Sequence, residues 1–115
     1  MSKQDEKVYQ LVTVTPKSIE EFSDFWAKVS LPEWKKRGIK HIGSWRYVSG
    51  GPDDQIVRLF EFKNHKHYEE WEKWLRDSDE GKVLMGKIHP YMKPRPDGSA
   101  GQPPRVPMLL TKVKY

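Results

Sequence analysis

The chain has 115 residues, no cysteine, and a formal net charge of +5 from 21 basic and 16 acidic residues. This length suits one domain with one core, so we expect residues 1–115 to fold as a single domain. The lack of cysteine excludes disulfides and cysteine-based metal or redox sites. Charges of both signs are spread along the chain, so we expect no nucleic-acid partner. With no apolar leader and no membrane-length apolar run, we expect a cytoplasmic protein without membrane contact.

The first predicted element is a strand over residues 7–15. Its sequence, KVYQLVTVT, is rich in β-branched and aromatic residues. Tyr9 and Leu11 fall on one face of this strand and Gln10 and Val12 on the other, because successive side chains alternate. The preceding residues 1–6 are polar, and we expect them to form a disordered tail.

A helix is predicted to follow the strand. Ser18 and Glu21 have the spacing of a capping box. Apolar side chains then recur at helical spacing through Trp26. Pro32 disfavours a regular helix interior, so a kink or a restart is expected near it, and Gly38 is placed to end the segment.

The centre of the chain predicts a hairpin with arms over residues 40–48 and 55–62. Residues 49–54, SGGPDD, supply the glycines and the proline that a chain reversal needs. Side chains two residues apart on a regular strand share a face. The first arm therefore predicts one face that carries four such residues: His41, Gly43, Trp45 and Tyr47.

Two helices and a last strand are predicted in the second half. Asn64 is a good cap for a helix over residues 65–76, and Ser78 or Asp79 can cap a shorter one over 80–91. Residues 94–107 are rich in proline and glycine and predict an extended connector. The last strand is expected over residues 106–115.

The order of these elements predicts an α+β, ferredoxin-like βαββαβ fold with a four-stranded antiparallel sheet. Ile56 and Phe60 share one face of the second hairpin arm, whereas Val57 and Leu59 share the other. A sheet with one wet face would alternate between apolar and polar residues. Two helices cover one face only, so we expect the second face to pack against another copy in a homodimer.

These elements resemble the NIPSNAP family of the dimeric α+β barrel superfamily. The resemblance rests on Gly43-Ser44-Trp45 and on GGPDDQIVRLFEF at residues 50–62, and it extends over residues 8–115. It implies a homodimer with a ligand pocket in each subunit between sheet and helices. The superfamily includes cofactor-independent monooxygenases, cyclases, isomerases, dehydratases and haem-degrading enzymes. The insert at residues 94–107 departs from the family pattern at the expected mouth of the pocket.

General acid–base chemistry suits this sequence better than other reaction classes. His65 and His67 fall on opposite sides of a helix, which makes them a poor metal site, and we expect no metal. Neither a nucleophile elbow nor a phosphate-binding glycine loop is present. His41 is the candidate base and Arg58 the candidate partner for an oxyanion. The plain alternatives are a structural histidine and an ion pair of Arg58 with Glu61 or Glu69.

We therefore expect a small cofactor-independent enzyme with an apolar, oxygenated or aromatic small-molecule substrate. The expected reactions are cyclisation, isomerisation, dehydration or oxygenation by proton transfer. Two alternatives remain: a non-enzymatic ligand-binding or scaffold protein, and a haem-binding relative with His41 or His89 as axial ligand. The side chains expected to contact the substrate are Trp45, Tyr47, Tyr9, Phe60, Trp26, His89 and Tyr91.

Overall fold

The computed structural model describes residues 6–93 and 108–113. The predicted tail and connector fall almost entirely outside these ranges. In chain order the elements are β1 (Val8–Val14), α1 (Ile19–Phe25), the π-helical turn η2 (Trp26–Ser30), α2 (Leu31–Lys36), β2 (Lys40–Arg46), β3 (Ile56–Phe62), α3 (His65–Asp77), α4 (Asp79–Ile88), the 3-10 turn η3 (His89–Tyr91) and β4 (Met108–Leu110).

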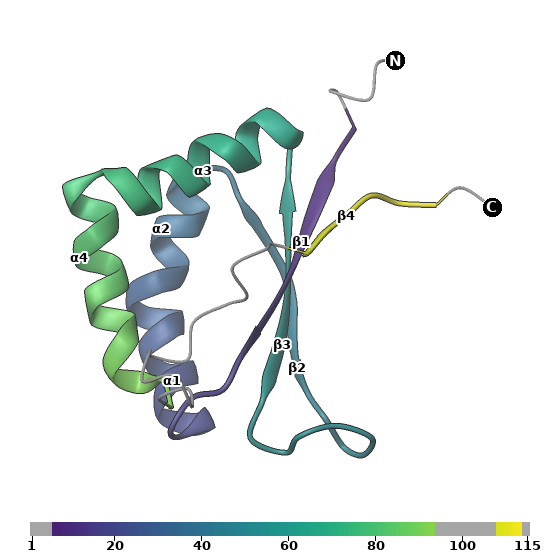
Figure 1. Ribbon diagram of the computed structural model, residues 1–115, viewed down its shortest axis with the longest axis vertical. Coiled ribbons are helices and arrows are strands. Elements are labelled where there is room, and N and C mark those ends of the chain that lie inside the picture. Colours follow the sequence, from purple (N-terminus) through teal and green to yellow (C-terminus); the bar gives the residue numbers. More distant parts are fainter. Residues whose placement is uncertain (1–5, 94–107, 114–115) are drawn as a thin grey trace.

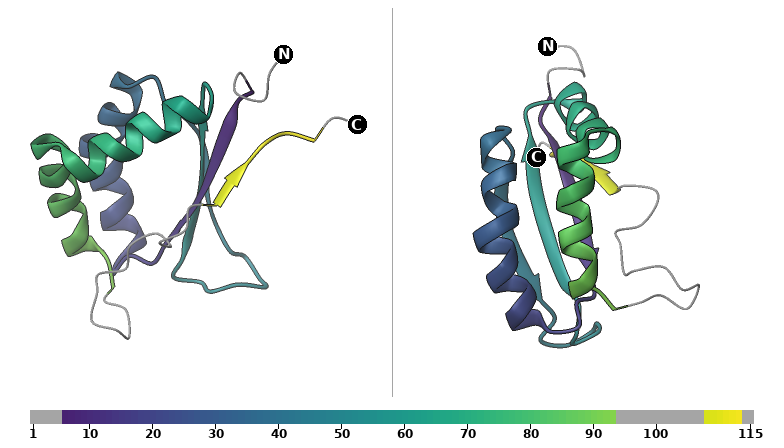
Figure 2. Two further views of the ribbon diagram at one scale, coloured as in Figure 1. Left: turned by 45° about the horizontal axis from the view of Figure 1, so that its top comes forward. Right: turned by 90° about the vertical axis from the view of Figure 1, so that its left-hand side faces the viewer.

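The four strands form one antiparallel sheet in the order β2-β3-β1-β4. All described helices lie on the same side of this sheet (Figure 1). Figure 2 shows the two helical arms, α1–α2 and α3–α4, side by side across that face. The predicted α+β, ferredoxin-like fold is therefore confirmed.

The core forms where the helices meet the sheet. In the β1–β3 pairing, Val14 lies opposite Ile56 and Val12 opposite Arg58, and all four side chains are buried. Aromatic residues from both helical arms pack over this row. The buried cluster contains Val12, Val14, Phe22, Trp26, Trp34, Ile39, Ile56, Phe60, Phe62, Tyr68, Trp71, Leu84 and Met92.

The interruption predicted near Pro32 takes the form of a π-helical turn. Pro32 has no N–H, so the regular bond to the Lys28 carbonyl cannot form. The Leu31 N–H instead donates to the Trp26 carbonyl, five residues back. The helix thereby gains a wide turn before α2, which ends at Lys36. Gly38 follows in the turn after the helix, with a φ of 75° that glycine readily adopts.

One sequence-based prediction about the hairpin is wrong. The pairing of β2 with β3 shifts by one residue between His41 and Gly43, which is a β-bulge. His41 lies opposite Phe60, whereas Trp45 lies opposite Val57, so they belong to different faces of the sheet. An extra residue in one strand inverts the alternation beyond it, and spacing alone does not reveal this.

The last strand is shorter than predicted. Only Met108–Leu110 form β4, and residues 111–113 are not part of a strand. Met108 pairs with Leu11 and Leu110 with Tyr9, so β4 forms the edge beside β1. Residues 106–107 and 114–115, which were also expected in this strand, lie outside the described residues.

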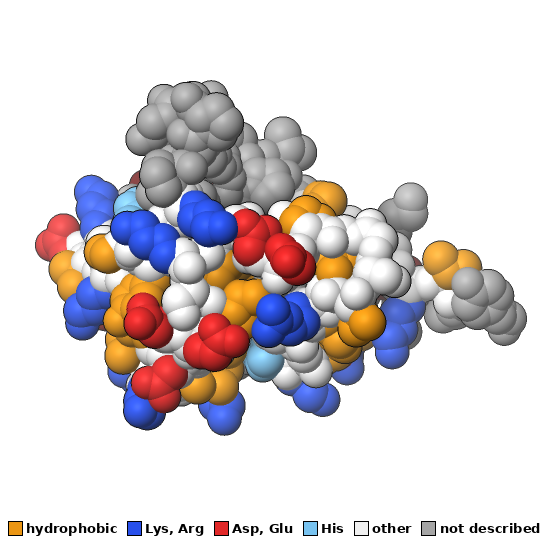
Figure 3. Space-filling model, turned by 90° about the horizontal axis from the view of Figure 1, so that it is seen from below, with side chains coloured by type: hydrophobic (Ala, Val, Ile, Leu, Met, Phe, Trp, Pro, Cys, Tyr) orange, Lys and Arg blue, Asp and Glu red, His pale blue; other side chains and the backbone are white. Residues whose placement is uncertain are grey.

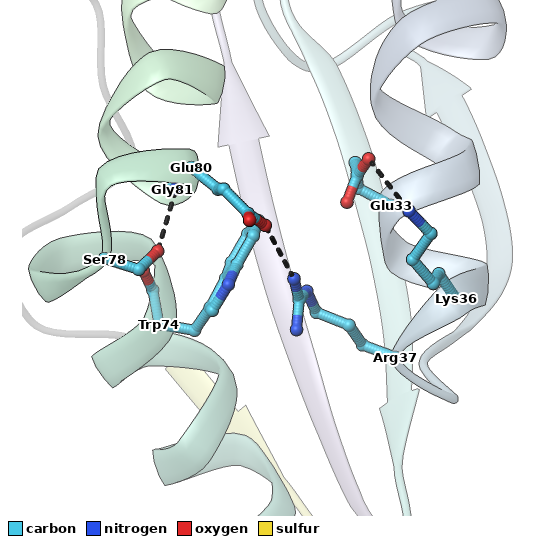
Figure 4. A network of polar contacts seen from close by, with 7 residues as sticks. All are labelled: Glu33, Lys36, Arg37, Trp74, Ser78, Glu80 and Gly81. Carbon is cyan, nitrogen blue, oxygen red and sulfur yellow. Dashed lines mark hydrogen bonds and ion pairs between the residues drawn. The ribbon is translucent and has the colours of Figure 1, made fainter.

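The helical arms are joined at one corner by polar contacts. The Arg37 guanidinium lies 3.5 Å from the centre of the Trp74 ring and 3.8 Å from a Glu80 carboxylate oxygen (Figure 4). Ser78 caps α4 by accepting from the Gly81 N–H at 2.8 Å. A Cβ atom at Gly81 would overlap the Trp74 carbonyl oxygen, so this close helix corner requires glycine.

His67 connects the same corner to the sheet. Its Nδ1 accepts from the Lys63 N–H at 3.0 Å, so its Nε2 carries the proton and donates to the Arg37 carbonyl at 2.8 Å. Its own N–H donates to the cap residue Asn64 at 2.8 Å. One side chain thus satisfies backbone groups at the end of β3 and the end of α2.

We predict that His67→Ala lowers the free energy of unfolding by about 1–3 kcal/mol, because two backbone groups lose their partners. His65→Ala is the matched control, since His65 is exposed and contacts Glu69 and Tyr68 on its own helix. Its change should stay within about 0.5 kcal/mol. Urea denaturation of both proteins measures the difference, and equal losses would contradict a bridging role for His67.

Candidate functional site

A cavity lies between the helix-covered face of the sheet and the helices. Its volume is about 90 Å³. Most of its wall is apolar, and three polar side chains interrupt it. The lining residues are Gln10, Val12, Val14, Phe22, Trp34, Arg58, Phe60, Trp71, Leu75, Met85, Ile88, His89 and Met92.

Arg58 is the charged residue of this cavity. The alternation of β3 directs it to the helix side, and it is only 7% exposed. Its guanidinium carbon lies 5.5–5.6 Å from the ring centres of Phe22, Trp26 and Phe60. Aromatic faces attract a cation at this distance, but they supply no hydrogen-bond acceptor of carboxylate strength.

The positive charge of Arg58 has no acidic partner among the described residues. Its Nε is buried without a hydrogen-bond acceptor. Glu61 contacts Tyr9 and Lys7, and Glu69 pairs with His65, so neither forms the ion pair considered from the sequence. Burial lowers the pKa of Arg58 to about 10, which leaves it protonated at neutral pH. This lowering corresponds to roughly 3 kcal/mol against the charged form.

His89 and Gln10 are the other polar side chains at the cavity wall. His89 begins the 3-10 turn η3 that follows α4, and it was predicted as a substrate contact. Gln10 was missed by the sequence-based search. It lies opposite Phe60 on β1, on the same face as Val12 and Val14. A single polar residue on an otherwise apolar strand face is the signal that could have identified it.

Trp26 packs against two of the aromatic residues that line this cavity. It belongs to the π-helical turn and contacts Phe60 at 5.8 Å and Trp34 at 5.7 Å between ring centres. Its indole N–H is buried and has no acceptor. Ser30, at the end of the same turn, also has a buried hydroxyl without a partner. Buried polar groups left unpaired are rare in folded proteins and often lie at functional sites.

His41 faces the helices but does not line the cavity. Its ring packs against Trp26 at 4.8 Å and Phe60 at 5.5 Å, and its Nε2 is 2.8 Å from the Ser44 hydroxyl. It lines a separate open hollow with residues that include Lys35. Burial and the charge of Arg58 both lower the pKa of His41 below its usual value.

The remaining predicted contacts are divided between the two faces of the sheet. Phe60 lines the cavity. Tyr91 stacks on Phe25 with ring centres 4.4 Å apart, next to the cavity residue Phe22. Tyr9 and Trp45 lie on the face away from the helices, because they pair with Glu61 and Val57. A Cβ atom at Gly51 would overlap the Tyr47 ring, which places Tyr47 at the hairpin turn.

Three further observations concern metal-ligating groups, helix length and surface charge. Within residues 6–93 and 108–113, no group of three or more His, Asp or Glu side chains is arranged to hold a metal ion. None of the helices in these ranges combines the length and hydropathy of a transmembrane span. On the face seen in Figure 3, basic side chains are interspersed with acidic ones.

Two solved structures from Burkholderia xenovorans are similar to this chain. One is an uncharacterized NIPSNAP domain protein with 14% identity and a TM-score of 0.69, matched over 94% of this chain and 96% of that one. The other is an uncharacterized NIPSNAP-like domain protein with 13% identity and a TM-score of 0.66, over 96% and 89%. No family model and no curated protein matches the sequence. The structural similarity confirms the NIPSNAP-type fold expected from the hairpin.

We predict that Arg58→Met raises the free energy of unfolding of the ligand-free protein by about 1–3 kcal/mol, because an unpaired buried charge is replaced by an apolar side chain of similar length. Arg76→Met is the control, since Arg76 is exposed on α3. Chemical denaturation at pH 7 measures both. A large loss of stability in Arg58→Met would show that the charge is already satisfied in the resting protein.

We also predict that the pKa of His41 lies below its usual value of about 6.5 and rises in Arg58→Met. Because folding lowers this pKa, the folded state binds fewer protons than the unfolded state. The contribution of His41 to stability is therefore complete above about pH 6.5 and decreases as the pH falls towards the folded pKa. NMR titration of the imidazole resonances measures this pKa. An unchanged His41 pKa in Arg58→Met would show that the charge of Arg58 does not lower it.

Proposed function

We propose that this protein, which has a NIPSNAP-type fold, is a small, cofactor-independent enzyme. Its reaction would be proton transfer on a mostly apolar molecule with a negatively charged oxygen. One observation supports this proposal most directly: Arg58 is a buried cation without an acidic partner in the described residues, in an apolar cavity that His89 also lines. Such an arrangement provides a place for an anion and a group that can exchange a proton.

Arg58 would act on the charge of the substrate. Removal of a proton beside a carbonyl or from a phenol places negative charge on oxygen, and this step precedes isomerisation, cyclisation, dehydration or oxygenation. In a water-poor cavity a fixed positive charge stabilises that oxygen more strongly than it would in water. The aromatic rings around Arg58 offer it no competing carboxylate.

His89 is the proton-transfer residue in this proposal, because it shares the cavity wall with Arg58. His41 remains the alternative base. It contacts Phe60, which lines the cavity, and its lowered pKa keeps it neutral and able to accept a proton near pH 7. The two histidines lie on different elements, η3 and β2, so separate substitutions can distinguish their roles.

The non-enzymatic alternative is a ligand-binding or scaffold protein that uses the same cavity without turnover. The haem alternative has less support. Ligand pockets typically have volumes of about 300–1,000 Å³. The cavity between the described helices and sheet measures about 90 Å³. His41 would also have to leave its contact with the Ser44 hydroxyl in order to bind iron through Nε2.

The proposed partner, besides the substrate, is a second copy of the chain. The face of the sheet away from the helices, here called the open face, carries Leu11, Val57 and Leu59 at its centre. Trp45 is 53% exposed beside them, and Met108 and Leu110 of β4 continue the apolar surface. Packing of two such faces would bury these side chains in a homodimer.

We predict that the protein catalyses exchange of carbon-bound protons for deuterium in small ketones and 2-oxo acids. His89→Asn and Arg58→Met should each slow this exchange by about 10²–10⁴-fold, whereas His41→Asn should stay within about threefold of wild type. Proton NMR in D₂O follows the reaction. If the His89→Asn protein is active and the His41→Asn protein is inactive, His41 is the proton-transfer residue. Ligand binding without any exchange would favour the non-enzymatic alternative.

We predict that Leu59→Asp converts a homodimer into a monomer, because a buried carboxylate in an apolar interface lacks a partner. Val48→Asp is the control, since Val48 is fully exposed in the hairpin turn. Light scattering coupled to size exclusion measures the mass of each protein. A wild-type monomer at micromolar concentration would refute the homodimer.

A further inference from the structure

We propose that the ligand of this cavity is a short-chain monocarboxylate, whose carboxylate is held by Arg58 and oriented by Gln10. This inference rests on the proposed function for the location of the site and goes beyond it by naming the chemical class of the ligand. The negatively charged oxygen then belongs to the carboxylate of the ligand, which is charged before any reaction occurs.

Two buried donors in this region have no acceptor. Arg58 Nε and Trp26 Nε1 are both buried without an acceptor, and the guanidinium lies 5.5 Å from the Trp26 ring centre. A guanidinium and an indole can donate hydrogen bonds but cannot accept them. A carboxylate is the complementary group, because when ionised it only accepts and it matches the fork of an arginine.

The charge of Arg58 is permanent, and this favours a permanent anion. The side chain stays protonated through the neutral pH range. An enolate that forms only during a reaction would leave the buried cation unpaired in the substrate complex. A carboxylate neutralises it from the moment of binding, and an opposite charge is what makes a buried cation tolerable.

The remaining lining residues restrict the ligand to one charge. Arg58 is the single lysine or arginine among the described residues that line the cavity, and most of the others are apolar. A second carboxylate on the ligand would therefore have no lysine or arginine of its own to pair with, which is costly. We infer that monocarboxylates are accepted and dicarboxylates are rejected.

Gln10 lies where it can contact the same group. It pairs with Phe60, and Val12 pairs with Arg58, so Gln10 and Arg58 are diagonal neighbours on adjacent strands and on one face. Such neighbours are about 7–8 Å apart, within reach of long side chains. The amide of Gln10 can donate to the second carboxylate oxygen and so fix its direction.

The size of the cavity limits the hydrocarbon part of the ligand. Its volume of about 90 Å³ is smaller than a cavity of about 150 Å³ that is known to admit benzene. We therefore expect a best fit at about three to five carbon atoms, with Phe22, Phe60 and Ile88 around the chain.

Isothermal calorimetry at pH 7 with butyrate, butyramide, succinate and octanoate tests the proposal on the 115-residue chain. Butyrate should bind at least tenfold more tightly than butyramide, because the amide lacks the charge, and also more tightly than succinate and octanoate. Arg58→Met should weaken butyrate binding by about 10–100-fold, and Gln10→Leu by about 3–10-fold. The surface variant Arg76→Met should leave it unchanged.

Equal binding of butyrate and butyramide, tighter binding of succinate, or undiminished butyrate binding by Arg58→Met would each overturn the proposal. Thermal unfolding of each variant shows whether it is folded. The Arg58→Lys protein provides a second check, because it should retain part of the charge preference. Carboxylate binding without proton exchange would leave this inference standing and refute the enzyme. Proton exchange on neutral ketones by a protein that binds no carboxylate would do the reverse.

Discussion

The burial of one positive charge between a sheet and an aromatic helix layer is the constraint on which the site depends. Arg58 occupies a position on β3 where every second residue enters the core, and its neighbours there are Ile56 and Phe60. An apolar side chain would pack at this position without any electrostatic penalty. The arginine therefore makes the ligand-free core less stable than an apolar residue would. Binding sites commonly lower the stability of a fold in this way.

Two local irregularities decide which side chains surround that charge. The π-helical turn Trp26–Ser30 provides a wide helical turn next to Arg58, and Trp26 contacts the guanidinium from it. The bulge after His41 separates the two ends of β2, so that His41 faces the helices and Trp45 faces the open side. Each irregularity adds one residue to a regular pattern, and each changes the position of an aromatic or titratable group.

The two faces of the sheet differ in what they present. The helix-covered face holds a buried cation and a small cavity, whereas the open face is apolar at its centre and partly exposed. A polar contact between Tyr9 and Glu61 lies on the open face, at one end of the β1–β3 pair. The same strands therefore support a ligand site on one side and a surface suited to a second subunit on the other.

The sequence by itself determined the order of elements, the helix caps at Ser18, Asn64 and Ser78, and the alternation that places Arg58 inside, because these depend on local chemistry. It also indicated the NIPSNAP-type fold through the hairpin. Only the tertiary structure decided that Gln10 and His89 share a wall with Arg58, and that His41 does not. Strand register, a bulge and the packing of distant helices set those distances, and none of them is encoded in spacing along the chain.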